Sequence, residues 1–328
     1  MHTRILGTEL QVSAVGLGCM GLSHAYGTAL DKKEAITRIR EAVDMGYTFF
    51  DTAEVYVGQY ADGTPAMNEE LVGEALKPIR DKVVVATKGG ITLGSQHHTV
   101  SDASPASLRR SLEQSLRRLQ TDTIDLYYQH RLDAAREPEE VAYTMQTFIK
   151  EGKIRHWGIS NASTDYIRRA HAVCPITAVQ ERYSLMYRQT SQLFPLLEEL
   201  HIGFVAYSPL ANSFLSGLYN GTEQFDKELD FRSWMPQYTE EGVQKAKELT
   251  YFLAGLSAEK NATPAQISLA WMLCKKPYIV PIPGTTKAKR LRENAEAADI
   301  TLSEEDIKKI DQVLDHSEFR VFAPHTES

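Results

Sequence analysis

Four polar residues of types that can tune a proton donor stand at, or just after, the ends of short apolar runs. Asp51 ends YTFFD, Lys88 ends VVVATK, His130 ends DLYYQH, and Tyr56 follows five residues after Asp51. If these runs are parallel strands, their carboxyl ends meet at one mouth of a barrel. A nearby ammonium lowers the pKa of a phenol, whose ordinary value of about 10 suits it poorly to proton transfer at neutral pH. The set predicts the chemistry of carbonyl reduction, in which a carbonyl oxygen is protonated.

Each of these four residues also has a purely structural interpretation. Lys88 and Asp51 could form an ion pair with no further role. His130 could be a satisfied core histidine, and Tyr56 is one of 15 tyrosines. A lysine that ends an apolar run needs a partner if it is buried. Placement at the ends of three different strands favours a shared role over these separate explanations.

Short apolar runs alternate with amphipathic stretches along the whole chain. An expected N-terminal hairpin, TRILGTELQVS, is followed by eight strand-like runs: AVGLGCM, YTFFDTA, KVVVATK, TIDLYYQH, IRHWGIS, TAVQERYS, GFVAYSPL and YIVPIPG. Apolar residues recur at three- and four-residue spacing between them, as in Lys32 to Met45, Pro105 to Leu119 and Gln192 to Leu200. Strands and helices in this alternation predict an α/β fold, a (β/α)8 TIM barrel in one domain spanning residues 1–328.

Two regions depart from this alternation. The segment from Ala211 to Tyr238 is rich in Gly and aromatic residues and is expected to be a long loop after the seventh strand, where a barrel carries active-site loops. Helical stretches near Glu240 to Lys260, Pro264 to Lys275 and Glu304 to Leu314 include extra C-terminal helices. Helix starts are expected at the caps Asp31, Ser104 with Pro105, and Ser303 with Asp306.

The first barrel run also contains GLGCMG, which matches the dinucleotide-binding pattern GxGxxG. That pattern requires a helix to open within the glycine loop, whereas turn-forming residues continue until about Lys32. The expected acidic residue is also misplaced, because Asp51 comes 30 residues after Gly21. We therefore expect the glycines to permit close approach of cofactor or backbone, with a Rossmann fold as the alternative.

Composition restricts the partners and the location. A net charge of −7, with acidic and basic residues interleaved, argues against a nucleic-acid partner. No signal-like or membrane-spanning apolar run is present, which predicts a cytoplasmic protein with no membrane partner. The widely spaced Cys19, Cys174 and Cys274 are expected to be reduced core thiols. His97 and His98 lack further ligands at metal-binding spacing, so no metal is expected.

The runs GLGCMG, FFDTAEVY, VVVATK, DLYYQH, HWGISN, QERYS, AYSPL and IPGTTKAKRLREN occur in this order over nearly the whole chain. Together they resemble the aldo-keto reductase family, most closely the branch with plant auxin-induced-like reductases, microbial aldehyde reductases and perakine reductase. The resemblance implies an NADP-dependent oxidoreductase of the alcohol dehydrogenase or aldehyde reductase type, which reduces aldehydes or ketones to alcohols. It implies Tyr56 as general acid, Lys88 as its tuner, Asp51 as the anchor of Lys88, and His130 as the residue that orients the substrate carbonyl.

The resemblance also implies an extended nicotinamide cofactor at the barrel mouth. Ser160, Asn161 and Gln180 match residues that bind the carboxamide, and Tyr207 matches the aromatic residue that stacks on the nicotinamide. The full expected set is Met20, Asp51, Ser160, Asn161, Gln180, Tyr207, Ser208, Pro209, Leu210, Gly217, Ile282, Gly284, Thr285, Thr286, Lys289, Arg290, Glu293 and Asn294.

The last members of this set decide the choice between NADPH and NADH. Thr285, Thr286 and the helix that starts near Lys287 provide an anion site. Lys289 and Arg290 are expected at a ribose 2′-phosphate, and Glu293 with Asn294 at the adenine. Many relatives carry Lys where this chain has Gly284, so one positive charge is absent. NADPH is expected, with NADH as the alternative.

Aromatic and apolar residues are expected to surround a small carbonyl substrate: Met20, His24, Tyr26, Val57, Tyr60, Phe214, Trp234 and Tyr238. Two other functions stay open. One is an NADPH-binding redox sensor or regulatory subunit, similar to potassium-channel β subunits. The other is a lyase that forms a Schiff base on Lys88. The sequence indicates no oligomeric state.

Overall fold

The structure of this protein is a computed structural model, and it describes residues 1–93, 99–219 and 221–322. Parallel strands form one eight-stranded sheet in the order β14-β13-β12-β11-β10-β7-β4-β3. Their bounds are β3 Leu17–Gly18, β4 Phe49–Asp51, β7 Val84–Gly89, β10 Ile124–Gln129, β11 Ile154–Ser160, β12 Ala178–Arg182, β13 Gly203–Tyr207 and β14 Ile279–Pro281. Seven of them lie within the predicted runs, and β7 extends one residue beyond its run, to Gly89.

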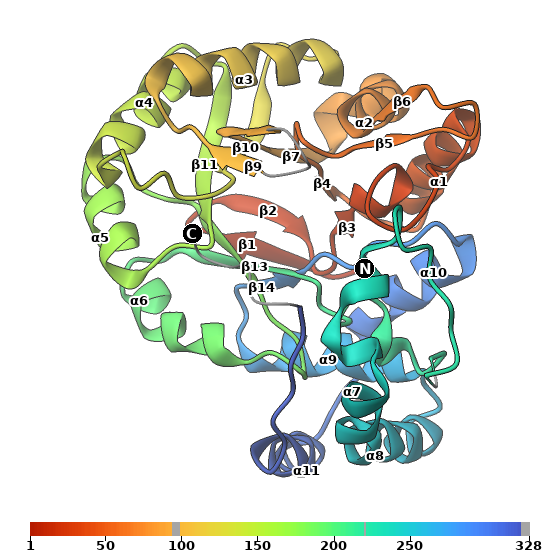
Figure 1. Cartoon of the computed structure of the whole chain (residues 1–328). Helices are drawn as coiled ribbons and strands as arrows, with labels where there is room; N and C mark the ends of the chain where they lie inside the picture. Colours follow the sequence, from red (N-terminus) through yellow and green to blue (C-terminus); the bar gives the residue numbers. More distant parts are fainter. Residues whose placement is uncertain (94–98, 220, 323–328) are drawn as a thin grey trace.

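The first and last strands join. The amide of Gly16 donates to the carbonyl of Pro281 at 3.0 Å, and that of Gly18 donates to Pro283 at 3.3 Å. These bonds close the sheet, and helices surround it (Figure 1). The predicted (β/α)8 TIM barrel is therefore confirmed.

The helices begin and end largely where the sequence predicts. Their bounds are α1 Lys32–Asp44, α2 Asn68–Leu76, α3 Pro105–Leu119, α4 Pro138–Lys150, α5 Thr164–Val173, α6 Phe194–Glu199, α7 Glu240–Lys245, α8 Lys247–Glu259, α9 Pro264–Lys275, α10 Ala288–Glu296 and α11 Glu304–Asp315. The side chains of Asp31, Ser104 and Ser303 each accept a bond from a first-turn amide, as expected of caps. The extra C-terminal helices α7, α8 and α11 extend beyond the ring of barrel helices (Figure 1).

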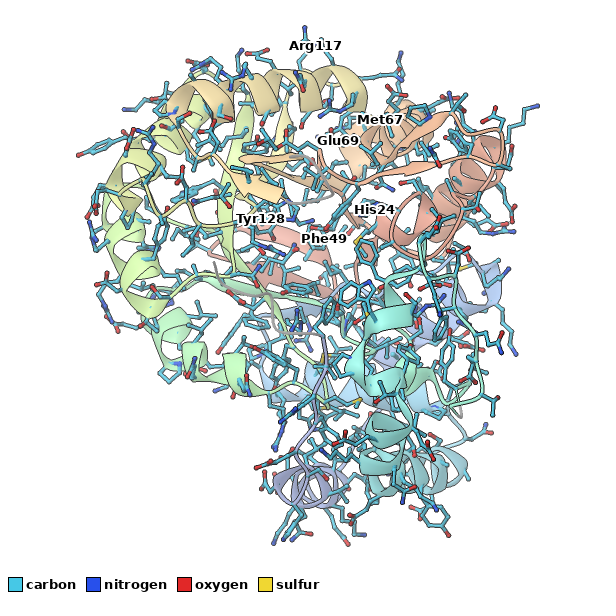
Figure 2. All side chains as sticks on the ribbon, viewed as in Figure 1. His24, Phe49, Met67, Glu69, Arg117 and Tyr128 are labelled. Carbon is cyan, nitrogen blue, oxygen red and sulfur yellow. The ribbon has the colours of Figure 1, made fainter. Side chains whose placement is uncertain are left out.

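A predicted N-terminal hairpin closes the end of the barrel opposite the strand carboxyl ends. Strand β1, Thr3–Leu6, pairs antiparallel with β2, Leu10–Ser13. Its buried residues Leu6, Leu10 and Val12 join the core inside the barrel, with Phe49, Ala86, Leu126, Tyr128, Ala178, Val205, Val280 and Ile282. Figure 2 labels Phe49 and Tyr128 in this interior.

Arg4 ties the hairpin to the last part of the barrel. Its guanidinium donates to the carbonyls of Leu273 at 2.6 Å, Lys276 at 2.6 Å and Ile279 at 2.9 Å. These carbonyls belong to the end of α9 and the start of β14, so the chain's beginning and its last barrel strand are fixed to each other.

Some elements were not predicted. Short hairpins follow two barrel strands, β5 Val57–Gln59 with β6 Pro65–Met67, and β8 Ile91–Leu93 with β9 Thr99–Ser101. Each of their strands has three residues, too few to produce a recognisable alternation. The described residues of the Ala211 to Tyr238 segment form a long irregular loop with short 3-10 helices at Phe214–Ser216, Phe231–Trp234 and Pro236–Tyr238, as expected.

The interpretation of the early glycines as a close-approach site is supported, whereas the prediction for the cysteines is only partly correct. A 3-10 turn at Met20–Leu22 and a helix that starts only at Lys32 exclude the Rossmann alternative for the early glycines. A Cβ on Gly18 would lie 2.6 Å from the Ile282 carbonyl, so this glycine allows close backbone approach.

Cys19 and Cys174 are buried, but the expectation of a core thiol is wrong for the exposed Cys274. Within the described ranges, no helix is long and apolar enough to span a membrane.

Candidate active site

A buried lysine lies at the centre of the mouth formed by the strand carboxyl ends. The Lys88 ammonium donates to the Asp51 carboxylate at 2.5 Å, to the Thr52 carbonyl at 2.7 Å and to the Tyr56 hydroxyl at 3.2 Å. Asp51 ends β4 and Lys88 lies near the end of the neighbouring β7. Both side chains are nearly inaccessible, with 1% of Lys88 and 3% of Asp51 exposed.

The backbone around Tyr56 is fixed by hydrogen bonds at both of its ends. Its amide donates to the Ala53 carbonyl at 3.2 Å, and its own carbonyl accepts from the Asn68 amide at 3.0 Å. Asn68 is the first residue of α2, and its side chain bonds Thr52 at 2.7 Å. The turn after β4 therefore holds the Tyr56 hydroxyl toward Lys88.

The charges at this site depend on one another. Burial raises the pKa of the Asp51 carboxyl, while Lys88 and the Gln180 amide act to lower it. Burial also acts to lower the pKa of Lys88, but the Asp51 carboxylate and the Tyr56 hydroxyl outweigh it and raise that pKa above its ordinary value. Lys88 therefore stays an ammonium ion beside the phenol.

His130 follows β10, and its ring stands edge-on to that of Tyr56, with centroids 6.0 Å apart and planes at 85°. Burial, followed by the charges of Arg131 and Lys88, holds its pKa well below 6.5, so the imidazole is neutral at neutral pH. Its Nδ1 is buried and has no partner in the described part of the chain. A neutral imidazole can donate one hydrogen bond to a ligand at the mouth.

A second set of hydrogen-bonded polar residues lies at the ends of β11, β12 and β13. Gln180 on β12 donates to the other oxygen of Asp51 at 2.7 Å. Asn161, just after β11, donates to Ser160 at 2.8 Å and accepts from the Tyr207 hydroxyl at 2.9 Å. The structure thus brings together the four residues expected at a nicotinamide and links them to Asp51.

The backbone is strained beside this group. Asn161 and Ser208 have left-handed φ values of 58° and 49°, and Ala211, Asn212 and Ser213 follow at 46°, 59° and 81°. Such conformations cost free energy for residues other than glycine and are concentrated at binding sites. The expected neighbours Pro209, Leu210 and Gly217 lie in or next to this stretch, and Gly217 is itself left-handed, with φ at 73°.

The remaining expected cofactor residues follow β14. A Cβ on Gly284 would lie 2.7 Å from the Gly18 carbonyl, so the seam between the first and last strands explains why a glycine stands here. Thr285 accepts from the amide of Lys287, the N-cap residue of α10, whose own side chain caps no amide. The first turn of α10 carries Lys289 and Arg290 and no acidic residue, which leaves its N-terminus suited to an anion.

A model of the aldo/keto reductase family matches residues 14–315. The chain belongs to this family. A probable aldo-keto reductase 1 of Glycine max is 42% identical over 308 residues, which cover 93% of this chain and 86% of that protein.

Solved structures of the family superpose on this aldo-keto reductase over almost its full length. A glycerol dehydrogenase of Gluconobacter oxydans matches with a TM-score of 0.86 and 27% identity, covering 99% of each chain. An aldo/keto reductase of Klebsiella pneumoniae, solved with NADP and acetate, matches with a TM-score of 0.73 and 28% identity, covering 98% of this chain and 99% of the other.

Only some of the expected substrate residues of this aldo-keto reductase lie near Tyr56. His24 stacks on Tyr56 with centroids 6.1 Å apart, and its Nδ1 donates to the Val57 carbonyl at 3.0 Å. Figure 2 labels His24 beside the barrel mouth. Met20 lies in the 3-10 turn that precedes His24, and Trp234 is 45% exposed.

The other expected substrate residues are placed elsewhere. Phe214 is 2% exposed and packs edge-on against Tyr238, so both belong to the interior of the long loop. Tyr26 accepts a bond from Asn212 in the same loop, and Tyr60 lies at the tip of the β5–β6 hairpin. The expectation that these four line a substrate site is not supported by their contacts. His97 and His98 lie outside the described residues.

Backbone hydrogen bonds join the long loop after β13 to the segment that follows β3. Tyr26 and Asp230 form an antiparallel bridge, the Gly27 amide donates to Leu229, and the Phe231 amide donates to Ala25. The loop therefore packs beside the mouth.

Sequence reasoning missed two aromatic residues beside this mouth, Phe231 and Phe322. Phe231 contacts both His24 and Trp234, with centroids 5.3 and 5.5 Å away. Phe322, near the C-terminus, contacts Trp234 and stacks on Arg182, and its amide donates to buried Gln237. Only the aromatic content of the loop hinted at Phe231; nothing in the sequence signalled that residue 322 returns to the mouth.

Proposed function

We propose that this aldo-keto reductase reduces aldehydes or ketones to alcohols with NADPH, and that Tyr56 is the general acid. One observation supports this most directly: the Lys88 ammonium lies between the Asp51 carboxylate, at 2.5 Å, and the Tyr56 hydroxyl, at 3.2 Å. A fixed positive charge next to a phenol stabilises the phenolate that proton donation leaves behind.

The residues of this chain divide the work as follows. Tyr56 donates its proton to the carbonyl oxygen of the substrate, and Lys88 stabilises the resulting phenolate. Asp51 and the Thr52 carbonyl keep the ammonium in position. The neutral His130 donates a hydrogen bond to the same carbonyl oxygen and orients it. The nicotinamide, when bound, supplies the hydride for the carbonyl carbon.

The residues at the mouth fit a nicotinamide cofactor. Ser160, Asn161 and Gln180 offer amide and hydroxyl groups for its carboxamide, and Tyr207 offers a ring to stack on. The strained backbone at Ser208 and the uncapped start of α10 suit the phosphates. Lys289 and Arg290 favour NADPH over NADH, although Gly284 leaves out one expected charge.

We also propose that residues 1–328 form one domain, supported by the bonds of Arg4 to the last strand. A cytoplasmic location and the aldehyde reductase subtype stay predictions. No observation favours a regulatory subunit or a lyase over the reductase.

The variant Tyr56→Phe tests the mechanism. We expect kcat to fall about 10²- to 10⁴-fold with a panel of aldehydes and ketones, because the variant lacks only the acid. Binding of NADPH, followed by its fluorescence, should change less than about twofold. Tyr251→Phe, at an 83% exposed tyrosine, is the matched control.

Three results would contradict parts of this proposal. Unchanged turnover in Tyr56→Phe excludes Tyr56 as the acid. Tight NADPH binding by the unmodified protein without turnover of any carbonyl indicates a sensor. Borohydride trapping of a substrate on Lys88 in the absence of nicotinamide indicates a lyase.

A further inference from the structure

One arginine at the barrel mouth has no role in the proposal above. Arg182 is the last residue of β12, two positions after Gln180, and pairs in register with Tyr207 on β13. Side chains two residues apart in a strand point to the same side, about 7 Å apart along the strand. Since Gln180 reaches Asp51 in the barrel centre, Arg182 lies on the same side, one step farther out.

Aromatic rings surround the Arg182 guanidinium. Its central carbon lies 3.9 Å from the centroid of Phe322, 5.0 Å from that of Tyr187 and 5.7 Å from that of Tyr207. An arginine that stacks on rings uses the faces of its plane, whereas its N–H donors point outward around the edge. This packing fixes the guanidinium plane, and no hydrogen bond or ion pair within the described residues uses its two terminal NH2 groups.

The structure provides no anion for this cation. The Arg182 Nε is buried without a hydrogen-bond partner, and no carboxylate of the described residues lies within 4.0 Å of the guanidinium. The adjacent Glu181 points to the opposite face of the sheet, where it accepts a bond from the Ala162 amide at 2.9 Å. A partly buried charge without a counterion costs free energy, which a bound anion would recover.

Other arginines beside the mouth are already occupied. Arg232 forms a multiple hydrogen-bonded ion pair with Asp230. Arg131 donates to the His130 carbonyl at 2.8 Å and lies 3.5 Å from the Ser160 hydroxyl. Arg182 differs from both, because its guanidinium stacks on aromatic rings and has no hydrogen-bond or ion-pair partner within the described residues.

We propose that Arg182 binds a carboxylate of the substrate, so that the preferred substrates are aldehydes or ketones that also carry a carboxylate. A planar carboxylate matches the two-pronged donor edge of arginine. The rings of Phe322 and Tyr187 beside the guanidinium offer apolar surface for the carbon body of such a substrate. This inference rests on the proposed reductase function and adds the substrate class.

Matched pairs of substrates test the inference. We compare 4-carboxybenzaldehyde with methyl 4-formylbenzoate, and 4-oxobutanoate with its methyl ester, using NADPH. Within each pair the aldehyde group and the carbon skeleton are the same, and the ester replaces the negative charge with a methyl ester. We expect the unmodified enzyme to favour the acids, and Arg182→Leu to reduce the ratio of kcat/KM for acid to ester about 10- to 100-fold. Arg182→Lys, which keeps the charge but not the planar fork, should lose less.

Arg188→Leu is the control, because Arg188 pairs with Asp315 on the surface, at 2.9 Å. It should leave the acid-to-ester ratio unchanged. The inference is overturned if the unmodified enzyme shows no preference for acids, or if Arg182→Leu leaves the ratio unchanged. It is also overturned if the variant's main defect is weaker NADPH binding, which would place Arg182 at the cofactor. If the enzyme reduces the esters but Arg182→Leu does not change the acid-to-ester ratio, the reductase proposal stands and the substrate proposal fails. If no aldehyde is turned over, both proposals fail.

Discussion

Lys88 is the residue on which the charge balance of the site depends. With 1% of it exposed, it compensates a carboxylate that is just as deeply buried. We expect Lys88→Met to lower the free energy of unfolding by about 3 to 5 kcal/mol near neutral pH, because it leaves Asp51 charged and unpaired. Without Lys88 the native pKa of Asp51 rises further above its unfolded value. The decrease in unfolding free energy caused by Lys88→Met should therefore be small near pH 4 and grow as the pH rises.

Chemical denaturation over a range of pH measures this effect. The double variant Asp51→Asn with Lys88→Met removes both charges and should regain most of the lost stability without regaining turnover. Equal stability of Lys88→Met and the unmodified protein near pH 8 would mean that the pair is not desolvated as described.

His130 gives a different pH dependence. Burial, Arg131 and Lys88 together depress its native pKa well below 6.5. We therefore expect no step in kcat/KM at about pH 6.5, where an ordinary histidine titrates. Because the unfolded chain binds this proton more readily, the associated stability is present above about pH 6.5 and is lost as the pH falls toward the native pKa.

The comparison of His130→Gln with the unmodified enzyme checks both statements. The variant should show a weaker fall in unfolding free energy between about pH 6.5 and 5. A limb in the activity profile near pH 6.5 that disappears in the variant would show that His130 titrates normally.

At the scale of elements, the seam between β3 and β14 leaves no room for side chains. A Cβ on Gly18 would lie 2.6 Å from the Ile282 carbonyl, a backbone atom that cannot move aside cheaply. We expect Gly18→Ala to lower the unfolding free energy by about 1 to 3 kcal/mol. The control Gly255→Ala, on α8 with nothing within 4 Å of the new Cβ, should be neutral or slightly stabilising. Thermal melting of the two variants provides the test, and equal melting temperatures would contradict it.

The same elements show what the sequence could and could not predict. Strong apolar runs such as VVVATK and DLYYQH, with clear caps at Asp31 and Ser104, predict the barrel strands and helix starts correctly. Hairpins with three-residue strands, such as β5 and β6, carry no such pattern.

At the barrel mouth, the sequence failed to predict some residues for a different reason. Strand ends are fixed by local sequence, so the meeting of Asp51, Lys88, Tyr56 and Gln180 follows from the fold. Which aromatic residues face the mouth depends on how the long loop folds on itself. Phe214 is therefore buried, and Phe322 reaches Arg182 from the other end of the chain.

For the whole molecule, the barrel separates the end that carries the chemistry from the end that carries the hairpin. Arg4→Met removes the donor for three backbone carbonyls. We expect the unfolding free energy to fall by about 2 to 5 kcal/mol, because some of these carbonyls lose their partner. Activity at 25 °C should remain within about twofold, since the substitution lies opposite the mouth.

Denaturant unfolding and steady-state kinetics on one preparation separate the two effects. Arg168→Met is the control, because Arg168 and Glu199 form an exposed ion pair worth less than about 1 kcal/mol. Loss of activity in folded Arg4→Met, or no loss of stability, would show that the two ends are not independent.

The bonds of Arg4 also have a consequence for biosynthesis. Its acceptors come 269 to 275 positions later in the chain. At about 5 to 20 residues per second, a ribosome needs roughly 15 to 55 s to make the intervening chain. During that time β3 has an open edge and the hairpin guanidinium lacks its acceptors. The nascent polypeptide therefore completes its barrel only after β14 has been synthesised, and until then it presents an unpaired strand to chaperones and to other copies of itself.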